Sequence, residues 1–571
     1  PAGQFGAEPA PDGTSYTYTV TMPPQITTAE QFGDIVVVTT SEGEQIRLRD
    51  VADVSLGSQS YGVSSLFEGK PTALIVIYQE PGSNAVAVGD KVKAEMARLG
   101  ERLPDGITTS TVVDTTTSID AGISDIFTTL IIALVLVICI IYLFIQDWRA
   151  TVIPLVAIPV SLVGAFALFP LLGFSINIIS LLGLVLAIGL VVDDAIVVVE
   201  AAQVNIANGM KPRAAALEAM KNVASPIVAT TVVLLAVFIP VSFTGGITGR
   251  LFQQFSVTIA VSVVISAFNA LTLSPALCAL LLRRREPPKK GFFAAFNRWF
   301  ARRMDKYTAF TPTLIRHVAR TGVFIAAVLA VIFLVWRKLP AGFLPEEDQG
   351  YVMVMVSTPE ASSLQVTQKA MIRADEVIRT LPEVASTSFA AGFNMMAGIA
   401  STDSGIIFVS LVGYSDRKLT AMEIAQKLTD ELYMAVPGAE CFAFIPPSIP
   451  GLGITSGVSV EVQDLEGRGT AYLLEQSERL MDSLRKLPSV ASVTTQFNAG
   501  VPQRRLRIDK EQALASGVDL GVLYGDLTTL LGGAYVNNFS RFGKLYQTYI
   551  QAAPAYRMDK RSLDSYYVAS S

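Results

Sequence analysis

Two adjacent aspartates lie inside a long apolar stretch of this sequence. Residues 183–200 read GLVLAIGLVVDDAIVVVE, so Asp193 and Asp194 have apolar neighbours on both sides. An ionised carboxylate at the centre of a bilayer costs roughly 2.5–3.5 kcal/mol on insertion scales, and such groups occur mainly in proton relays, ion sites and ligand counter-ions. The alternative, a helix end whose acids reach the headgroups, fits poorly because AIVVV follows the pair. The sequence therefore predicts a protonatable pair.

This pair needs a balancing cation and a close neighbouring helix. Successive helical residues point about 100° apart, so the carboxylates diverge, and their titrations are expected to be coupled. Glu200 follows Asp193 by seven residues on the same face, near one end of the helix. Gly183 and Gly189 allow a second helix to pack closely. The first five apolar stretches contain no Lys or Arg, so the cation is expected from outside them.

The composition places this helix in a membrane protein. The 571 residues are 51% hydrophobic and 16% charged, with a mean hydropathy of +0.46, whereas soluble domains are about 25% charged. A membrane span needs about 20 apolar residues. Six stretches qualify or come close: Ile126–Ile145, Ala150–Gly173, Ile178–Val199, Ala224–Phe243, Phe255–Leu282 and Val318–Trp336.

The charges predict how these spans are oriented. Residues 1–122 hold 7 basic and 16 acidic residues, residues 123–339 hold 18 and 8, and residues 340–571 hold 19 and 25. Basic residues concentrate in the connections after the first, third and fifth spans, which are therefore expected to be cytoplasmic. Both acidic soluble parts then share the opposite side. Nucleic-acid binding is not expected, because the soluble parts lack a basic footprint.

An amphipathic helix is predicted between the fifth and sixth spans. The segment GFFAAFNRWFARRMDKY, residues 291–307, places aromatic side chains on one helical face and basic side chains between them. Beside two membrane spans, this pattern is typical of a helix that lies in the cytoplasmic membrane interface.

The soluble parts repeat a strand–helix–strand pattern three times. The copies cover residues 73–113, 351–390 and 458–497, with period-2 strands around helices of 12 to 15 residues. This pattern predicts split βαβ, ferredoxin-like units. The fold class expected is therefore an α+β membrane protein with a helical transmembrane bundle and ferredoxin-like soluble subdomains.

A longer repeat links the two ends of the sequence. At a lag of 530 residues, five of 26 positions are identical: Gly13/Gly543, Tyr16/Tyr546, Pro24/Pro554, Asp34/Asp564 and Val38/Val568. Repeats of six-span halves are common in transporters. We therefore expect this chain to cover about one period of a duplicated parent, with further residues before Pro1 and after Ser571.

The sequence suggests an ion gradient as the energy source. It contains no GxxxxGK[ST] nucleotide loop. One histidine and three cysteines provide neither a histidine-rich metal site nor a disulfide framework, so no metal and no cofactor are expected. One proton moved down a potential of 100 mV supplies about 2.3 kcal/mol, and tenfold accumulation of a solute requires about 1.4 kcal/mol.

Several motifs together resemble one known family. GLVVDDAIVVVE, FSIN, VSFTGGITGRLFQQFS and LTLSPALCALLL in the apolar part are similar to the resistance-nodulation-division superfamily. The doubled aspartate, with FLPEEDQGYVM, LRDVADV and DLTTLLGGAYVNNF, resembles its hydrophobe/amphiphile efflux branch, the AcrB-type multidrug exporters. The resemblance implies proton-driven export of amphiphilic compounds, with Asp193 and Asp194 as the relay and their lysine partner on a late helix of the second half. It also implies a homotrimer in a Gram-negative inner membrane, joined to a periplasmic adaptor and an outer-membrane channel.

The same resemblance implies a drug pocket in the periplasmic porter subdomains. The deep pocket is expected to contain Phe389, Phe393 and Phe408, and the outer cleft Met353, Met355, Phe442 and Phe444. A switch loop between them corresponds to GFNMMAGIA, with Gly392, Met395, Met396 and Gly398. Aromatic and thioether groups suit diverse ligands, because they contact without directional demands. Strand alternation in a plain core gives the same spacing, so both interpretations stay open. Val113, where the family often has an aromatic residue, predicts a less aromatic pocket.

Two other functions fit the sequence less well than drug export. A Cu(I)/Ag(I) exporter of the same superfamily is suggested by Met395 and Met396, but neighbouring strand residues point apart and cannot chelate together unless they lie in a loop. An intramembrane aspartyl protease needs two carboxylates that face each other from separate helices, whereas Asp193 and Asp194 share one.

The expected subdomains follow the motifs along the chain. They are residues 1–57, part of a first-half docking subdomain; 58–122, part of a first-half porter subdomain; 123–285, five transmembrane helices with the relay helix at 178–200; 286–316, the interfacial helix; 317–338, the sixth transmembrane helix; 339–502, second-half porter subdomains; and 503–571, the start of a second-half docking subdomain.

Overall fold

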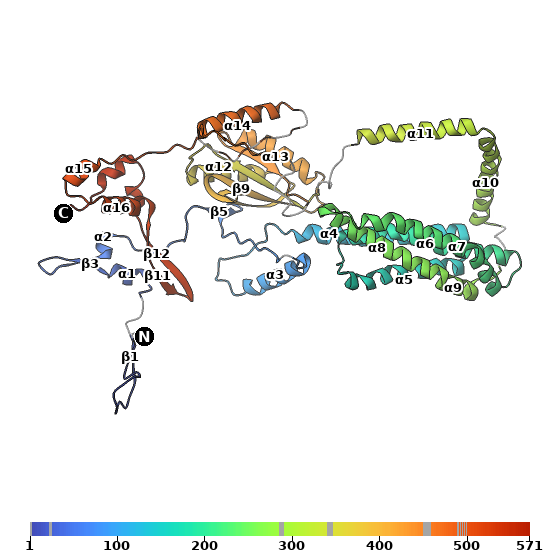
Figure 1. Cartoon of the computed structure of the whole chain (residues 1–571), viewed down its shortest axis with the longest axis horizontal. Helices are drawn as coiled ribbons and strands as arrows, with labels where there is room; N and C mark the ends of the chain where they lie inside the picture. Colours follow the sequence, from blue (N-terminus) through green and yellow to red (C-terminus); the bar gives the residue numbers. More distant parts are fainter. Residues whose placement is uncertain are drawn as a thin grey trace.

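The protein is elongated, and three regions follow one another along its long axis (Figure 1). A helical bundle occupies one end, a sheet with attached helices lies in the middle, and small hairpins form the other end. The computed structural model describes residues 3–21, 26–80, 82–284, 290–339, 347–448, 460–487 and 500–570, together with 458, 490, 493, 495 and 497.

Six described segments are long and apolar enough to cross a membrane, and they match the six stretches predicted from the sequence. The helices are α4 (Thr116–Ile145), α5 (Trp148–Leu172), α6 (Ile178–Ala207), α7 (Pro212–Val241), α8 (Gly246–Leu271) with α9 (Leu273–Leu281), and α11 (Val318–Lys338). The fifth span is interrupted at Thr272, between α8 and α9. Pro275 explains the interruption, because its ring clashes with the carbonyl of the residue four positions earlier in a continuous helix.

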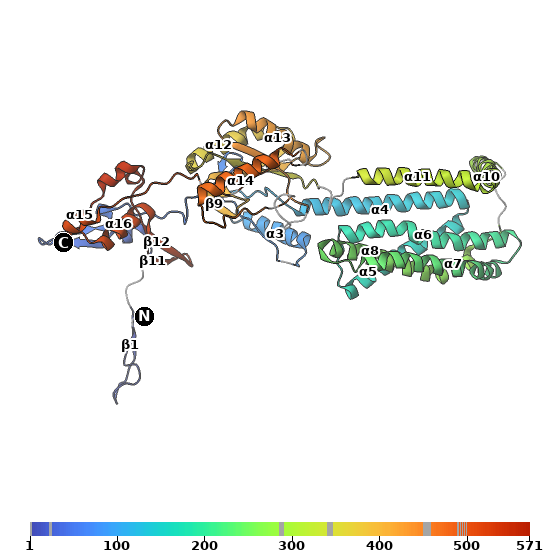
Figure 2. The same cartoon turned by 45° about the horizontal axis from the view of Figure 1, so that its top comes forward.

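Close contacts between small residues hold α6 against α8. A Cβ atom added at Gly183 would lie 3.1 Å from the backbone oxygen of Phe255, so the two helices approach where no side chain separates them. Ala187, Ala195 and Ala202 on α6 are also fully buried. By contrast, α11 buries none of its residues, and it stands apart from the other spans in Figure 1, although it overlaps the direction of α4 in the turned view of Figure 2.

The predicted amphipathic helix forms as α10 (Phe292–Arg316). It lies at the end of the bundle that is farthest from the sheet, and it runs across the direction of α11 (Figure 1). Of the expected interfacial segment, residues 285–289 lie outside the described part of the chain.

The central sheet has the strand order β10-β7-β9-β8-β5-β6, and all its pairings are antiparallel. The strands are β5 (Ser64–Phe67), β6 (Lys70–Pro71), β7 (Tyr351–Ser357), β8 (Val384–Asn394), β9 (Ile399–Leu411) and β10 (Glu440–Phe444). Helices α12 (Leu364–Ile378) and α13 (Ala421–Ala435) connect β7 to β8 and β9 to β10. This is the split βαβ topology predicted for the second repeat, extended at one edge by β5 from the early part of the chain.

The other two repeats form their helices without the predicted strands. The helices are α3 (Ala85–Gly100) and α14 (Thr470–Arg485). Residues 73–79 and 103–113 are described and form no strand, and Ile75 and Tyr78 are exposed. Residues 458 and 460–464 also form none, while most of 488–499 lies outside the described residues. The strand prediction is wrong here because a strand needs a neighbour for its backbone groups, and 73–79 pairs with no described segment.

Short elements from both ends of the chain lie at the far end of the molecule (Figure 1). The early ones are β1 (Gly3–Phe5), β2 (Tyr18–Val20), α1 (Ala29–Gly33), β3 (Val36–Thr39), β4 (Gln45–Arg47) and α2 (Leu48–Val51). The late ones are α15 (Lys510–Ala515), α16 (Leu520–Gly532), β11 (Ala534–Arg541), β12 (Lys544–Ile550), and the 3₁₀ turns Pro554–Tyr556 and Lys560–Ser565. Phe32 of α1 packs edge-on against Phe539 of β11, with ring centroids 5.4 Å apart.

Candidate functional site

The two aspartates lie half-way along α6, as the sequence predicted. The helix begins with a capping box, in which the Asn177 side chain accepts from the backbone N–H of Ser180 and the Ser180 hydroxyl accepts from the N–H of Asn177. No proline or charged residue interrupts the helix before Asp193. The pair therefore lies in the middle of an apolar helix rather than at a helix end.

The two carboxylates occupy different surroundings. Asp194 is half-buried between α6 and α8, where the Ser266 Oγ lies 3.1 Å from its Oδ2 and 3.0 Å from the backbone oxygen of Val191. One hydroxyl proton serves one acceptor at a time, so Ser266 donates either to the carboxylate or to the backbone. Asp193 is exposed on the outer side of α6. The divergence expected for adjacent helical residues is thus observed.

Asp193 belongs to an uncovered stripe of α6. Leu182, Leu186, Val197 and Val204 are each more than 40% exposed. Together with Gly189, Asp193 and Glu200, which are also exposed, they recur every three or four residues. Glu200 is exposed on the same stripe. Within the described chain, no Lys or Arg forms an ion pair with Asp193 or Asp194, so the expected counter-cation is not supplied there. The stripe presents a carboxylate without its charge partner.

A buried polar row on α8, which the sequence analysis did not identify, faces this region. Thr258, Ser262, Ser266 and Asn269 are all buried. Asn269 donates from Nδ2 to the Oγ of Ser161 on α5 at 2.9 Å, and this contact ties α8 to a second helix. The sequence does contain a signal for this row, because Thr258, Ser262 and Ser266 recur every four residues within an apolar span.

The sheet separates the residues predicted for the drug pocket onto two faces. Phe389 is 1% exposed and belongs to the core between the sheet and helices α12 and α13. Met353, Met355, Phe408 and Phe444 lie in a second apolar cluster, to which no described helix residue contributes. We call this second cluster, with Phe442, the open sheet face; the rings of Phe442 and Phe444 stack with centroids 5.8 Å apart.

The segment predicted as a switch loop is a tight hairpin turn between β8 and β9. Gly392 has a φ of +93°, and a Cβ there would collide with the backbone oxygen of Gly62. Phe393 is half-buried just before the turn. Met395 and Met396 lie in the turn, and Gly398, with a φ of +67°, ends it by donating its N–H to the Asn394 carbonyl at 2.9 Å.

The position of this turn corrects one argument from the sequence. Met395 and Met396 are not strand neighbours, so strand geometry does not prevent joint metal binding. Instead, the side chain of Met395 packs against the open sheet face. Within the described residues, no group of His, Cys, Asp and Glu is arranged to hold a metal ion.

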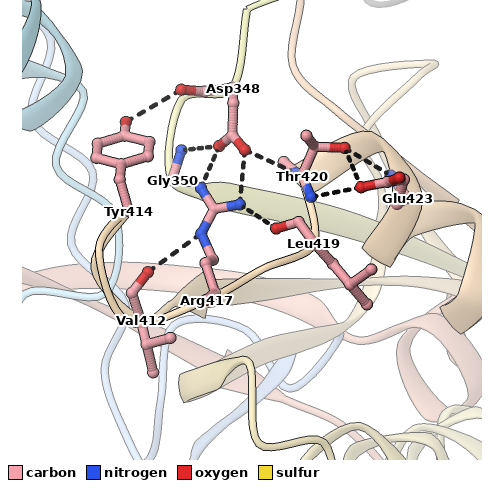
Figure 3. Close-up of polar contacts among 9 residues, drawn as sticks. Asp348, Gly350, Val412, Tyr414, Arg417, Leu419, Thr420 and Glu423 are labelled. Carbon is pink, nitrogen blue, oxygen red and sulfur yellow. Dashed lines mark hydrogen bonds and ion pairs between the residues drawn. The ribbon is translucent and has the colours of Figure 1, made fainter.

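An ion-paired cluster fixes the entry of the chain into the sheet (Figure 3). Both carboxylate oxygens of Asp348 accept from the Arg417 guanidinium at 2.6 Å, and backbone N–H groups of Gly350 and Ala421 donate to the same carboxylate. Burial alone would raise the pKa of Asp348, but these hydrogen bonds outweigh it and hold the pKa below its ordinary value. Tyr414 donates to the Asp348 carbonyl, and its ring lies under Arg417. In the sequence, Asp348 is visible only as part of the motif FLPEEDQGYVM.

Comparison with known proteins gives a consistent result. A family model described as "AcrB/AcrD/AcrF family" matches residues 1–571. The toluene efflux pump membrane transporter TtgB of Pseudomonas putida is 35% identical over 99% of this chain and 55% of its own length. Two proteins of Escherichia coli are also similar to it: the multidrug export protein AcrF, 34% identical over 100% of this chain and 56% of its own length, and the multidrug resistance protein MdtF, 34% identical over 99% of this chain and 55% of its own length. The chain spans about half the length of these curated relatives.

Proposed function

Because this chain belongs to the AcrB/AcrD/AcrF family, we propose that it is part of a transporter that exports hydrophobic and amphiphilic compounds by proton antiport. The observation that carries the proposal is the carboxylate pair half-way along an apolar helix, with Asp194 against α8 and Asp193 on an uncovered stripe. No catalytic reaction is part of the proposal, and the relatives compared are named as efflux or export proteins and a resistance protein.

The proposed relay works through a change of charge. When the pair is ionised, it attracts a cation on a helix that covers the Asp193 stripe; when it is protonated, that attraction is lost. Each state then favours a different helix packing, and proton entry and release move the protein between them. Ser266 holds the Asp194 carboxylate against α8, so a change of charge at Asp194 alters the contact between α6 and α8.

We place the substrate contacts on the open sheet face. Met353, Met355, Phe408, Phe442 and Phe444 supply thioether and aromatic surface there, and Met395 of the turn borders it. Such surface binds diverse apolar ligands. Phe389 acts from the opposite face as core support, because it packs with α12 and α13. For Phe393 and Gly392 we retain the proposal of a pocket edge and switch element.

The proposed topology puts the sheet and hairpins in the periplasm and α10 at the cytoplasmic surface of a bacterial inner membrane. The described sheet and hairpins lie beyond one end of the bundle and α10 lies at the other, which supports this orientation (Figure 1). The distribution of basic residues gives the same orientation. We retain the subdomain boundaries given above, and propose assembly as a homotrimer with a periplasmic adaptor and an outer-membrane channel.

Export of drugs is favoured over export of Cu(I) or Ag(I). TtgB is named as a toluene efflux pump and AcrF as a multidrug export protein. The proposal is tested in cells that express the protein from its native gene and lack other efflux pumps. Asp193→Asn and Asp194→Asn should each abolish export of a fluorescent amphiphile while expression is unchanged, because an amide is nearly isosteric but cannot carry a proton.

The matched control is Asp125→Asn, which removes an exposed carboxylate in the first third of α4 and should leave export intact. Export at the wild-type rate in both α6 variants would show that the acids are structural, and the antiport proposal would fall.

A further inference from the structure

We propose that helix α10 binds the anionic headgroups of phospholipids in the membrane leaflet that it faces. The proposal rests on the proposed membrane embedding of the bundle and is independent of export. Two features support the proposal: the contacts that hold α10 at the end of α4, and the basic side chains that α10 presents in that position.

Aromatic contacts set the depth of α10. Phe144, in the last turn of α4, packs edge-on against Phe296 and Phe300 with ring centroids 5.5 and 5.6 Å apart, and Tyr142 packs against Phe293 at 5.8 Å. Aromatic side chains concentrate at membrane–water interfaces, at the level of the headgroups. Because α4 is a predicted span that ends at Ile145, these contacts hold α10 at the level where a span leaves the apolar core.

A pair of amide side chains fixes the rotation of α10 about its axis. Gln146, directly after α4, donates from Nε2 to Asn297 Oδ1 at 2.6 Å, and Asn297 donates back to the Gln146 Oε1 at 3.1 Å. Gln146 is 9% exposed, so the pair is largely sheltered from water. This reciprocal bond keeps the aromatic face of α10 against α4 and prevents the helix from rolling.

With this rotation fixed, α10 presents a basic face. Arg298, Arg302 and Lys306 recur every four residues and therefore form one row, and Arg303 lies over the Trp299 ring at 5.8 Å. All four basic side chains are exposed, and none forms an ion pair with another described residue. Asp305 is the one acidic residue in α10.

This combination favours a lipid surface over an acidic protein as the occupant. A basic row directly beside an aromatic face is what an interfacial helix needs to bury its rings and reach phosphate groups with long side chains. Each Lys or Arg near an anionic membrane surface is worth about 1 kcal/mol, or about fivefold in an equilibrium constant. An acidic protein would use the charge but would leave the neighbouring rings exposed.

Trp299 provides a probe at the site itself. The full chain, with Trp148→Phe and Trp336→Phe so that Trp299 is the remaining tryptophan, is placed in nanodiscs of phosphatidylcholine and phosphatidylglycerol in equal parts. Either lipid is supplied in brominated form, which quenches nearby tryptophan fluorescence. Brominated phosphatidylglycerol should quench Trp299 more strongly than brominated phosphatidylcholine, and added salt should reduce the difference, because salt screens exposed charges.

Neutralising the row should remove this preference. The variant R298Q/R302Q/R303Q/K306Q is expected to lose at least about fivefold in relative association of phosphatidylglycerol, whereas R298K/R302K/R303K, which keeps the charge, retains it. Gln at Arg468, Arg479, Arg485 and Lys486, on and beside α14, is the matched control and should have no effect. Because the four α10 side chains are exposed, the variant should fold, and R302Q/K306Q offers a milder change with a smaller loss.

The possible outcomes separate the two proposals. Equal quenching by both lipids would show that α10 does not select anionic headgroups, and an acidic protein would then be the better candidate for its basic face. The proposal that the bundle lies in a membrane would remain intact. Quenching by neither lipid would overturn the interfacial position as well. A preference that persists in the quadruple Gln variant, or that the α14 control also loses, would show that α10 is not the site.

Discussion

The hydroxyl of Ser266 on α8 lies 3.1 Å from the Asp194 carboxylate on α6, and 3.0 Å from the backbone oxygen of Val191 on the same helix. A single side chain thus connects the proposed proton site to the helix packed most closely against it. The carboxylate and the backbone compete for one donated proton, so the strength of the α6–α8 contact depends on the charge of Asp194.

This relationship gives a graded prediction. Ser266→Ala should lower the export rate about tenfold, because a hydrogen bond to a charged group contributes about 1.5 kcal/mol at the low end and 1.4 kcal/mol is a factor of ten. Asp194→Asn should abolish export. Rates of efflux in cells with matched expression provide the measurement. Ser256→Ala, which changes another buried α8 serine without a partner among the described residues, is the control.

The sequence was sufficient to find Asp194 but not its partner. Two acids in an apolar helix are visible in any linear pattern, since burial of charge is costly wherever the helix packs. Ser266 becomes a partner only through the rotation of α8 about its own axis, which tertiary packing sets. The four-residue spacing of Thr258, Ser262 and Ser266 marks a polar row, and the close approach at Gly183 decides that it faces α6.

The sheet shows more clearly that tertiary packing decides what a sequence pattern leaves open. The strand pattern at 351–390 formed strands because β9 lies between β7 and β8, whereas the equally apolar residues 73–79 found no partner in the described chain. Alternation within β8 could not decide whether Phe389 faces ligand or core. That choice depends on the face that α12 and α13 cover, and those helices cover the Phe389 side.

The two faces of the sheet predict different phenotypes for two phenylalanines. Phe389→Ala should lower the free energy of unfolding by about 3–5 kcal/mol, because it leaves a cavity in the core. Expression should fall, and export of every substrate should fall with it to the same extent. Phe408→Ala should change the substrate profile unevenly, with losses of about 1–3 kcal/mol for ligands that contact it. Expression levels and minimal inhibitory concentrations for a panel of amphiphiles separate these results. Uniform loss and poor folding for Phe408→Ala would place it in the core instead.

The topology predicts opposite labelling of two engineered cysteines. Lys290→Cys should react with a membrane-impermeant maleimide only after the cells are opened, whereas Met434→Cys, at a side chain 79% exposed on α13, should react in intact cells. The native cysteines are replaced first, and the parent without them serves as the background control. Labelling of position 290 from outside intact cells would reverse the proposed orientation.

Asp348 predicts acid sensitivity of the sheet region. Arg417 has a side chain 3% exposed, so Asp348→Asn leaves a buried guanidinium unpaired and should destabilise this region by about 3–5 kcal/mol at neutral pH. The folded-state pKa of Asp348 lies below its ordinary value of 3.8, so the stabilisation is complete above that value and is lost as the pH falls through the lower, folded-state pKa. Hydrogen exchange of β7 and α13 amides should therefore differ between wild type and variant at neutral pH and converge in acid.

Asp482→Asn removes an exposed pair with Arg485 and should change exchange little at any pH, since such pairs contribute about 0–1 kcal/mol. A wild-type to variant difference that stays constant down to the most acidic pH would show that the Asp348 charge does not hold this junction together.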